Sequence, residues 1–291
     1  MKKQKRILIF GAGVIGSAYA VKFIEAGVDV TLFARSTRYV TLKRDGLRYL
    51  KKGKLVTVRA KVIDKLADDD IYDFIFVTVR ADKAASALSA LKENRSPNIV
   101  TLISNATDFS KWQAIVGARL LPGFPGVGGQ LNDGVLNARY LPKVLASTTV
   151  GEIDGTVTPR LNELAALFEA AKRPLAIQSD MQALLMTHAV SDIAMLGTLY
   201  DDHIPDNRKA QAMAVKLKTT LYALQSTGIS VTPATTRLIL WIPNAGLRLF
   251  FGQWLKTNMV KEMKEPAYAQ GAKREMQWLE ADLEKYLHTH K

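Results

Sequence analysis

A glycine pattern close to the N-terminus constrains the fold of this chain more than any other feature. An apolar run at residues 7–10 ends in the segment Gly11-Ala12-Gly13-Val14-Ile15-Gly16. The run predicts a buried parallel strand, and residues 14–26 predict a helix that Gly27 closes. At this spacing the first glycine permits a tight turn, the second lets the backbone approach a pyrophosphate, and the third lets helix and strand pack closely. N–H groups at the start of the helix attract phosphates. The six residues therefore predict a dinucleotide site, the alternative being a glycine turn that holds no ligand.

The end of the second predicted strand, residues 28–33, indicates which dinucleotide is bound. Enzymes that use NAD usually carry an acidic residue about twenty residues past the first glycine, where it holds the ribose 2′-hydroxyl. This chain has Arg35 there, with Arg38 close behind. A guanidinium group can hold a 2′-phosphate through two hydrogen bonds. The sequence therefore favours NADP(H), the alternative for each arginine being a solvated surface position.

Strand-like and helix-like segments alternate through the first half of the chain. Apolar runs at residues 73–79 and 98–103 predict strands, and a helical pattern at 84–92 lies between them. This alternation predicts a doubly wound parallel sheet of the Rossmann type. A helix at 161–171 and strands at 143–153 and 174–177 are expected to complete it.

The second half is helical in pattern, with long helix-period segments at 181–199, 209–227, 235–257 and 269–287. The predicted fold class is therefore α/β followed by all-α. We expect an NADP-binding Rossmann domain at residues 1–179 and a helical substrate and dimerisation domain at 180–291, so that a homodimer is one expected assembly.

Composition excludes several kinds of chemistry. The chain has no cysteine, which rules out disulfides, thiolate metal sites and cysteine nucleophiles and favours a reducing, cytoplasmic location. The four histidines are too scattered in sequence to suggest a metal site, so we expect no metal.

The net charge of +13 has two interpretations, a nucleic-acid or membrane partner and a protein that holds anionic ligands. Basic residues form no long run and no recognition motif, so we expect no nucleic acid. The N-terminus looks like a secretory signal, but the glycine pattern and the βαβ unit continue through it. Polar residues interrupt the apolar segment 238–255, which argues against a membrane span, and we expect no membrane partner.

These segments together resemble the ketopantoate reductase family (2-dehydropantoate 2-reductases). The resemblance covers the whole chain and is densest over residues 7–35. Further matching segments are Val77-Thr78-Val79-Arg80, Ile103-Ser104-Asn105-Ala106 and Thr148-Thr149-Val150-Gly151. The resemblance implies an NADPH-dependent reductase of a small 2-oxo acid, with a role in pantothenate biosynthesis.

The resemblance also implies roles for four residues. Asn105 would lie beside the nicotinamide ribose and the substrate hydroxyl, unless it is a strand-end asparagine in a turn. Arg80 would replace a family lysine near the cofactor, keeping its charge but not its geometry. Glu275 would be a glutamate on a late helix that faces the active site. Asn258 would stand where the family has a substrate-contacting serine. A solvated surface position is the alternative for both.

The main departure from the family lies on the helix predicted at 181–199. The family places its general-acid lysine there, followed four residues later by asparagine, and the aligned residues are Thr187 and Ser191. A ketone that accepts a hydride becomes an alkoxide and needs a proton donor, and a threonine hydroxyl is a poor acid. His188, with Asp192 four residues on, is the nearest titratable candidate, unless it is a helix histidine with no catalytic duty.

Two further segments allow alternative interpretations. The glycine-rich element Phe124-Pro125-Gly126-Val127-Gly128-Gly129 either approaches a ligand or simply connects two strands. The apolar segment from Trp241 to Trp254 is core, a subunit contact or the wall of an apolar substrate pocket.

Three functions therefore stay open. They are reduction of a small 2-oxo acid, reduction of another carbonyl compound on the same architecture, and NADP binding without catalysis. The missing lysine separates them.

Overall fold

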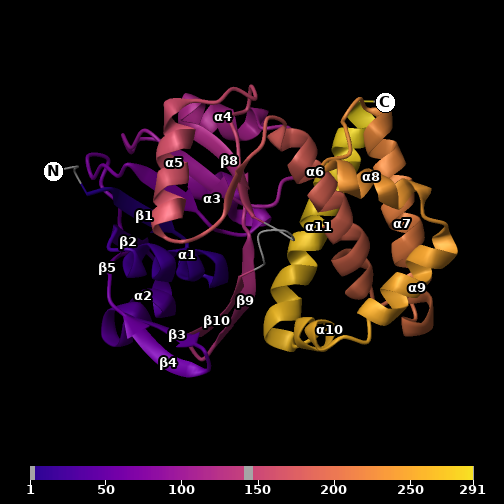
Figure 1. Cartoon of the computed structure of the whole chain (residues 1–291), viewed down its shortest axis with the longest axis horizontal. Helices are drawn as coiled ribbons and strands as arrows, with labels where there is room; N and C mark the ends of the chain where they lie inside the picture. Colours follow the sequence, from indigo (N-terminus) through magenta and orange to yellow (C-terminus); the bar gives the residue numbers. More distant parts are fainter. Residues whose placement is uncertain (1–3, 141–146, 291) are drawn as a thin grey trace. The chain divides into compact units, whose positions relative to one another are not determined.

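The computed structural model of the chain describes residues 4–140 and 147–290, and it divides into two compact units (Figure 1). The α/β unit consists of Met1–Ile103 and Phe109–Met181, and the helical unit of Ser104–Asp108 and Gln182–Lys291. The predicted fold class, a Rossmann-type sheet followed by an all-α half, is confirmed. One short segment, residues 104–108, groups with the helical unit although it follows a strand of the sheet.

The described part of the α/β unit is built on an eight-stranded sheet with the order β12-β11-β8-β7-β6-β1-β2-β5. Six neighbouring strands from β5 to β8 are parallel, and β11 joins β8 antiparallel. Its strands are β1 (Arg6–Phe10), β2 (Asp29–Phe33), β5 (Lys61–Ile63), β6 (Phe74–Val77), β7 (Ile99–Leu102), β8 (Leu120–Phe124), β11 (Thr148–Val150) and β12 (Leu175–Ile177). Every residue of β6 and β7 is buried, which explains their continuous apolar sequence. Residues 143–146 of the strand expected at 143–153 lie outside the described residues.

Helices of this unit pack on the sheet through aromatic side chains. They are α1 (Val14–Glu25), α2 (Ser36–Asp45), α3 (Ala84–Ser89), α4 (Ser110–Val116) and α5 (Pro159–Ala170), with short 3-10 turns η1 (Ala81–Lys83) and η2 (Gly117–Arg119). The Phe23 ring of α1 lies 5.3 Å from that of Phe76 in β6 and 5.4 Å from that of Phe168 in α5. These contacts fix α1, and hence the glycine turn before it, against the sheet.

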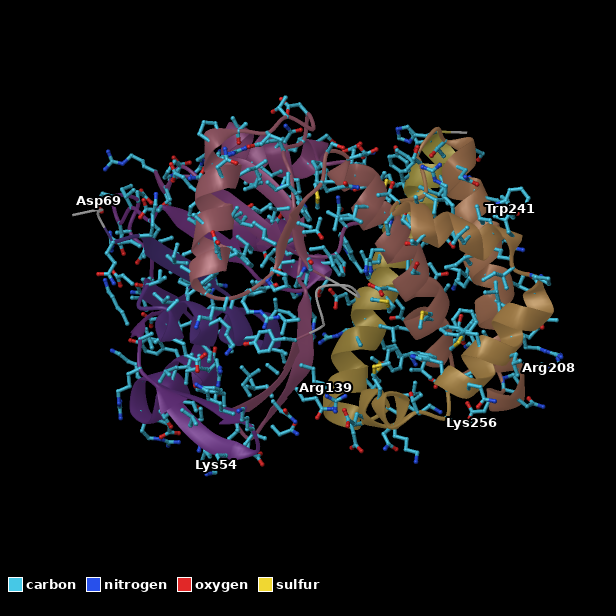
Figure 2. All side chains as sticks on the ribbon, viewed as in Figure 1. Lys54, Asp69, Arg139, Arg208, Trp241 and Lys256 are labelled. Carbon is cyan, nitrogen blue, oxygen red and sulfur yellow. The ribbon has the colours of Figure 1, made fainter. Side chains whose placement is uncertain are left out.

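A second, four-stranded sheet in the described α/β unit was not predicted from the sequence. Its order is β4-β3-β10-β9, formed by β3 (Leu47–Lys51), β4 (Lys54–Val58), β9 (Val127–Asn132) and β10 (Val135–Tyr140). Lys54 is the first residue of β4 and follows the tight turn of the β3–β4 hairpin (Figure 2). The sheet is attached to α1, since the Tyr140 hydroxyl donates to the Ala18 carbonyl at 2.9 Å.

The helical unit contains α6 (Met181–Asp192), α7 (Asp206–Ser226), α8 (Ala234–Trp241), α9 (Asn244–Trp254), α10 (Asn258–Met263) and α11 (Pro266–Thr289). A π-helical turn, η3 (Ile193–Gly197), continues α6. The single helix predicted at 235–257 is wrong, because the chain breaks at Pro243 into α8 and α9. Among the described residues, none of the helices is both long enough and apolar enough to cross a bilayer.

Candidate functional site

The carboxyl ends of β1, β2 and β6 form the first part of the candidate site. From β1 the chain proceeds to β2 and β5 on one side, and from β6 to β7 and β8 on the other. This reversal of direction between β1 and β6 is where open α/β sheets bind ligands, beyond the carboxyl ends of the strands. The predicted glycine loop follows β1, Arg35 follows β2 and Arg80 follows β6, so the sheet gathers them at one edge.

The glycine loop has the geometry that the sequence predicts. Gly11 has φ +116°, which a side chain would strain, and a Cβ on Gly16 would lie 2.0 Å from the Gly11 carbonyl oxygen. A Cβ on Gly13, in contrast, meets nothing within 4 Å. Gly11 and Gly16 are therefore required by packing, whereas Gly13 leaves open space next to the start of α1. No acidic residue occupies the first turn of α1, so its N–H groups can face an anion.

Thr78, which belongs to one of the segments that resemble the family, has a specific role in the structure. Its hydroxyl donates to the Gly11 carbonyl at 2.7 Å, and its backbone N–H donates to the Phe10 carbonyl at 3.0 Å. Both bonds tie the end of β6 to the glycine loop. Arg80, two residues further, is exposed at the start of η1. A hydroxyl residue directly after the fourth Rossmann strand is the sequence signal that could have identified Thr78.

Arg35 and Arg38 have different environments. Arg35 is exposed, and its guanidinium lies 5.3 Å from the centre of the Phe33 ring. Arg38 is half-buried and donates to the Ala12 carbonyl at 2.9 Å and to the Ser17 hydroxyl at 3.1 Å. Burial lowers the pKa of Arg38, and nearby Arg48 lowers it further. Arg38 therefore stabilises the loop, and Arg35 has a guanidinium at the surface where a 2′-phosphate can reach it.

The second glycine-rich element, residues 124–129, is explained by strand packing. β8 ends at Phe124, and Gly128 and Gly129 lie within β9 rather than in a loop. Gly129 has φ +143°, and a Cβ there would lie 2.2 Å from the Asn137 carbonyl oxygen. The Gly126 N–H donates to the hydroxyl of Tyr19, which fixes the turn to α1. The alternative of a plain connecting loop is therefore wrong for Gly128 and Gly129, and approach to a ligand stays a prediction.

Asn105 lies in the short segment that groups with the helical unit. It is 2% exposed, and its side-chain amide donates to the carbonyls of Thr107 at 2.8 Å and Asp108 at 3.3 Å. This is the turn environment that the sequence left as the alternative. The amide hydrogens thus stabilise the segment after β7, and contact with a substrate stays a prediction.

The helix α6 carries Thr187, His188, Ser191 and Asp192. Thr187 is 2% exposed, and its hydroxyl oxygen accepts the backbone N–H of Thr232 at 3.1 Å. The Ser191 hydroxyl donates to the Thr187 carbonyl at 3.0 Å. Thr187 is therefore buried as a structural acceptor, and a lysine at this position would place an ammonium group in the interior.

His188 has the environment of a titratable group on the same helix. Its side chain is 42% exposed, and its Nδ1 atom lies 3.7 Å from a carboxylate oxygen of Asp192. Burial lowers the pKa of His188, but Asp192 more than compensates, so that the pKa lies above its ordinary value. The histidine is therefore held closer to its protonated form than a free imidazole would be.

Glu275 and Asn258 are placed on later helices of the same unit. Glu275 is half-buried on α11, and Asn258 is exposed as the first residue of α10. Their assignment to the site stays a prediction.

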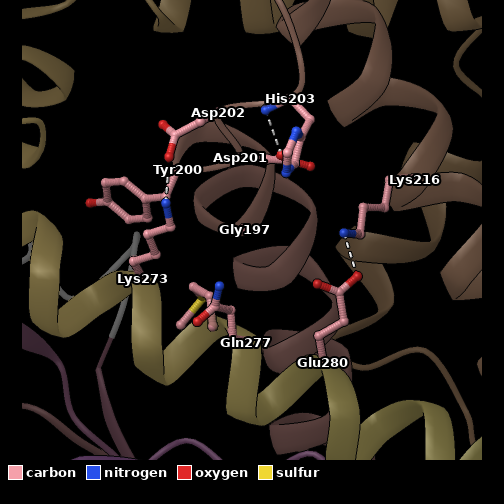
Figure 3. Close-up of a pocket in the computed structure, with 10 residues that line it drawn as sticks. Gly197, Tyr200, Asp201, Asp202, His203, Lys216, Lys273, Gln277 and Glu280 are labelled. Atoms are coloured by element: carbon pink, nitrogen blue, oxygen red, sulfur yellow. Dashed lines mark hydrogen bonds and ion pairs between the residues drawn. The ribbon is translucent and has the colours of Figure 1, made fainter.

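A cavity of about 280 Å³ lies within the helical unit, between the end of η3, α7 and α11 (Figure 3). Lys216 pairs there with Glu280 at 2.5 Å, and Lys273 pairs with Asp202 at 2.5 Å. The residues that line it include none of the predicted site residues. Because each lysine is held by a carboxylate, this cavity is a poor site for an anionic substrate. The described residues also contain no cluster of three or more His, Asp or Glu side chains that could hold a metal ion.

The two units define the class of this protein, a Rossmann-type sheet with a glycine-rich first turn and an all-α second half. Residues 7–128 match the family model described as ketopantoate reductase PanE/ApbA. The resemblance predicted from the sequence is confirmed: this part of the chain is similar to the ketopantoate reductase family.

One curated relative and several solved structures are similar to this chain. A 2-dehydropantoate 2-reductase of Archaeoglobus fulgidus is 29% identical over 198 residues, which cover 66% of this chain and 63% of the relative. The chain thus matches slightly less than two thirds of that relative's length. The solved 2-dehydropantoate 2-reductase of Porphyromonas gingivalis W83 has a TM-score of 0.67 at 16% identity, covering 98% of this chain and 97% of its own. A D-mandelate dehydrogenase, solved with NADH and anilino(oxo)acetate, has a TM-score of 0.65 at 14% identity, covering 96% and 99%. At such identities the solved structures show the fold alone.

Proposed function

We propose that this protein is an NADPH-dependent reductase of a small 2-oxo acid, with the cofactor held by the α/β unit. The observation that carries the proposal is the open space over Gly13, with Arg35 and Arg80 following the two strands next to β1. In this proposal the pyrophosphate lies against the loop from Gly11 to Gly16. Residues 1–179 bind the cofactor and residues 180–291 supply the substrate side. A cytoplasmic small-molecule reductase fits this division.

The preference for NADPH over NADH follows from the charges at the end of β2. An acidic residue there would accept hydrogen bonds from the ribose hydroxyls of NADH and repel a 2′-phosphate. The chain has Arg35 instead, followed by Ser36 and Thr37 at the start of α2, whose first turn contains no acidic residue. These groups together form a site that favours a phosphate dianion.

The proton for the reduced carbonyl is assigned to His188. When bound, NADPH supplies a hydride to the carbonyl carbon, which leaves negative charge on the carbonyl oxygen. His188 donates a proton to that oxygen, and Asp192 keeps the imidazole protonated until the transfer. Thr187 has no acidic proton to offer, and its hydroxyl oxygen is engaged by Thr232. In this proposal Thr187 therefore positions the helix and takes no part in the chemistry.

A second candidate is reduction of a more apolar 2-oxo compound on the same architecture. The lysine expected on α6 is absent, which is the observation that separates this chain from the family's usual reaction. The D-mandelate dehydrogenase of the same fold was solved with anilino(oxo)acetate, an aromatic 2-oxo acid derivative. An enzyme that relies on histidine for its proton can share that substrate class. The third possibility is a protein that binds NADPH without catalysis.

A substrate panel separates these three functions. Purified protein is mixed with NADPH and, in turn, with ketopantoate, pyruvate and phenylglyoxylate, and absorbance of the reduced nicotinamide is followed. We expect turnover of at least one 2-oxo acid, with ketopantoate about a hundredfold slower than a lysine-based reductase, the scale that a general acid contributes. NADPH binding measured by calorimetry without turnover of any compound would leave only the non-catalytic function.

A further inference from the structure

The helices α8 and α9 present an apolar surface that the described parts of the chain do not cover. We define the α8–α9 face by its exposed apolar residues, Leu238, Trp241, Ile242, Leu249 and Phe250. No residue of α8 is buried, although five of its eight residues are apolar. Trp241 is 86% exposed and is labelled at the edge of the helical unit in Figure 2. Large apolar surfaces of this kind mark contact sites.

Two hydrogen bonds join α7 to the C-terminal end of α8. The Lys218 ammonium group of α7 donates to the Ile242 carbonyl at 3.0 Å, and the Tyr222 hydroxyl donates to the Leu240 carbonyl at 3.4 Å. In contrast to α8, the helix α9 buries two apolar side chains, Leu247 and Phe251. Leu238 and Trp241 of α8 are therefore large apolar side chains that lie outside the core.

The segment of the chain that forms this face carries charge of one sign. Residues 207–261 contain no aspartate or glutamate, and they carry lysine and arginine throughout. Arg237 on α8 and Arg248 on α9 are exposed within the face, and Lys256 is exposed just after α9. The whole chain has a net charge of +13. The face thus combines apolar side chains, an exposed tryptophan and neighbouring cations.

We propose that the α8–α9 face attaches the protein to an anionic lipid surface. Helices that lie in a membrane interface bury an apolar face a few ångströms below the headgroups and place basic residues among them. Tryptophan favours this interfacial depth. Anionic headgroups supply the negative charge that residues 207–261 lack. Such attachment needs no membrane-spanning helix.

Two other occupants fit the face less well. A second copy across a two-fold axis would bring two patches of the same positive charge together, and residues 207–261 supply no carboxylate to offset it. A nucleic acid would use the cations but not the aliphatic side chains at the centre, because its affinity comes mainly from phosphate contacts. A lipid surface uses both features.

The test is binding of the full chain to lipid vesicles of two compositions. One set contains phosphatidylcholine with roughly 30% phosphatidylserine, and the other contains phosphatidylcholine alone. The protein should co-sediment with the anionic vesicles and not with the neutral ones. Raising the salt from about 0.1 M to about 1 M should release it, because the screening length falls from about 10 Å to about 3 Å.

Three variants identify the face. Trp241→Ser should weaken binding to anionic vesicles about tenfold or more, as expected for one large apolar side chain withheld from burial. Arg248→Gln should weaken it about fivefold, the effect of one cation near the surface. The matched control is Val157→Ser, an equally simple change at a 67% exposed apolar residue in the α/β unit, which should leave binding unchanged. Thermal melting of each variant verifies its folding, and Arg248→Gln keeps the test valid if Trp241→Ser unfolds.

Several results would overturn the proposal. The first is failure of the folded wild type to bind anionic vesicles, and the second is equal binding by wild type, Trp241→Ser and Arg248→Gln. A dimer in solution that Trp241→Ser dissociates, without vesicle binding, would assign the face to a second copy. Duplex DNA binding that the same variants abolish, again without vesicle binding, would assign it to nucleic acid.

Discussion

Arg35 is the residue on which the choice of cofactor depends. Arg35→Asp places a carboxylate where the 2′-phosphate would lie, so NADPH should bind at least tenfold more weakly, while NADH affinity should hold or rise. Tenfold corresponds to about 1.4 kcal/mol, the scale of one charge-assisted contact. Calorimetric titration of both cofactors measures this change.

The control for Arg35→Asp makes the same arginine-to-aspartate change at another position of α2. Arg44→Asp lies at the other end of α2, where the arginine pairs only with its neighbour Asp45 among the contacts seen. It should change NADPH affinity less than about twofold if the effect of Arg35 is a contact rather than a long-range field. Wild-type protein that binds NADH and NADPH equally well would contradict the cofactor assignment.

His188 links activity to pH in a defined direction. Its pKa is raised in the folded protein, so the pairing with Asp192 stabilises the fold below the unfolded pKa, and this stabilisation is lost as pH rises through the folded pKa. If His188 is the proton donor, activity falls over the same upper range. His188→Gln should remove that descending limb and lower turnover by about two orders of magnitude or more.

Two further variants show whether His188 acts in the reaction itself. Asp192→Asn should move the descending limb to lower pH, because it removes the carboxylate that raises the pKa. His203→Gln, at an exposed histidine of the same unit, should leave the profile unchanged. An unchanged profile in His188→Gln would assign the proton to another group.

At the scale of elements, variants of the β1–α1 turn distinguish the glycine needed for packing from the glycine proposed to contact the ligand. Gly13→Ala adds a methyl group that meets no neighbour, at a residue with φ −77°, so the melting temperature should stay nearly the same. The methyl would occupy the space proposed for the pyrophosphate, and NADPH binding should fall at least tenfold. Calorimetry and thermal melting of the variant give the two measurements.

The matched variant Gly16→Ala should mainly destabilise the fold, whereas Gly13→Ala should mainly weaken NADPH binding. Gly16→Ala would bring a Cβ to within 2.0 Å of the Gly11 carbonyl oxygen, which forces the backbone apart, so the fold itself should be strongly destabilised. If Gly13→Ala binds NADPH normally in a folded protein, the open space over the loop does not hold the cofactor.

Elements also differ in how well the sequence predicted them. Strands β1, β6 and β7 lie within the sheet and are almost wholly buried, so their sequences are apolar except for Arg6 and Thr101 and are easy to identify. The strands β3, β4, β9 and β10 are partly exposed and contain lysine, glycine and asparagine. Their pairing joins segments far apart in the sequence, such as β3 with β10, and local pattern carries no signal of such a contact.

At the scale of the whole molecule, cofactor binding should stabilise the folded chain. A ligand that binds only the native state adds about 2.7 kcal/mol at a hundred times its Kd. For a protein of this size, NADPH at that concentration should raise the melting temperature by several degrees. NADH at the same concentration should raise it less, and Gly13→Ala should show no shift with either. A wild-type melting temperature that NADPH leaves unchanged would contradict binding to the native state.

The sequence by itself determined the Rossmann class, the glycine loop, the arginine after β2 and the helical second half. These features depend on local periodicity and on the backbone freedom of glycine, both of which can be read from consecutive residues. Only the tertiary structure decided the roles of Arg38, Thr187 and Asn105. Each has a polar side chain that bonds to a backbone group. Arg38 donates to the carbonyl of Ala12, and Thr187 accepts the N–H of Thr232, both distant in sequence. Asn105 donates to the carbonyl of Thr107 in the neighbouring turn. Residue type specifies what such a side chain can bind, and the folded chain determines whether that capacity is already used.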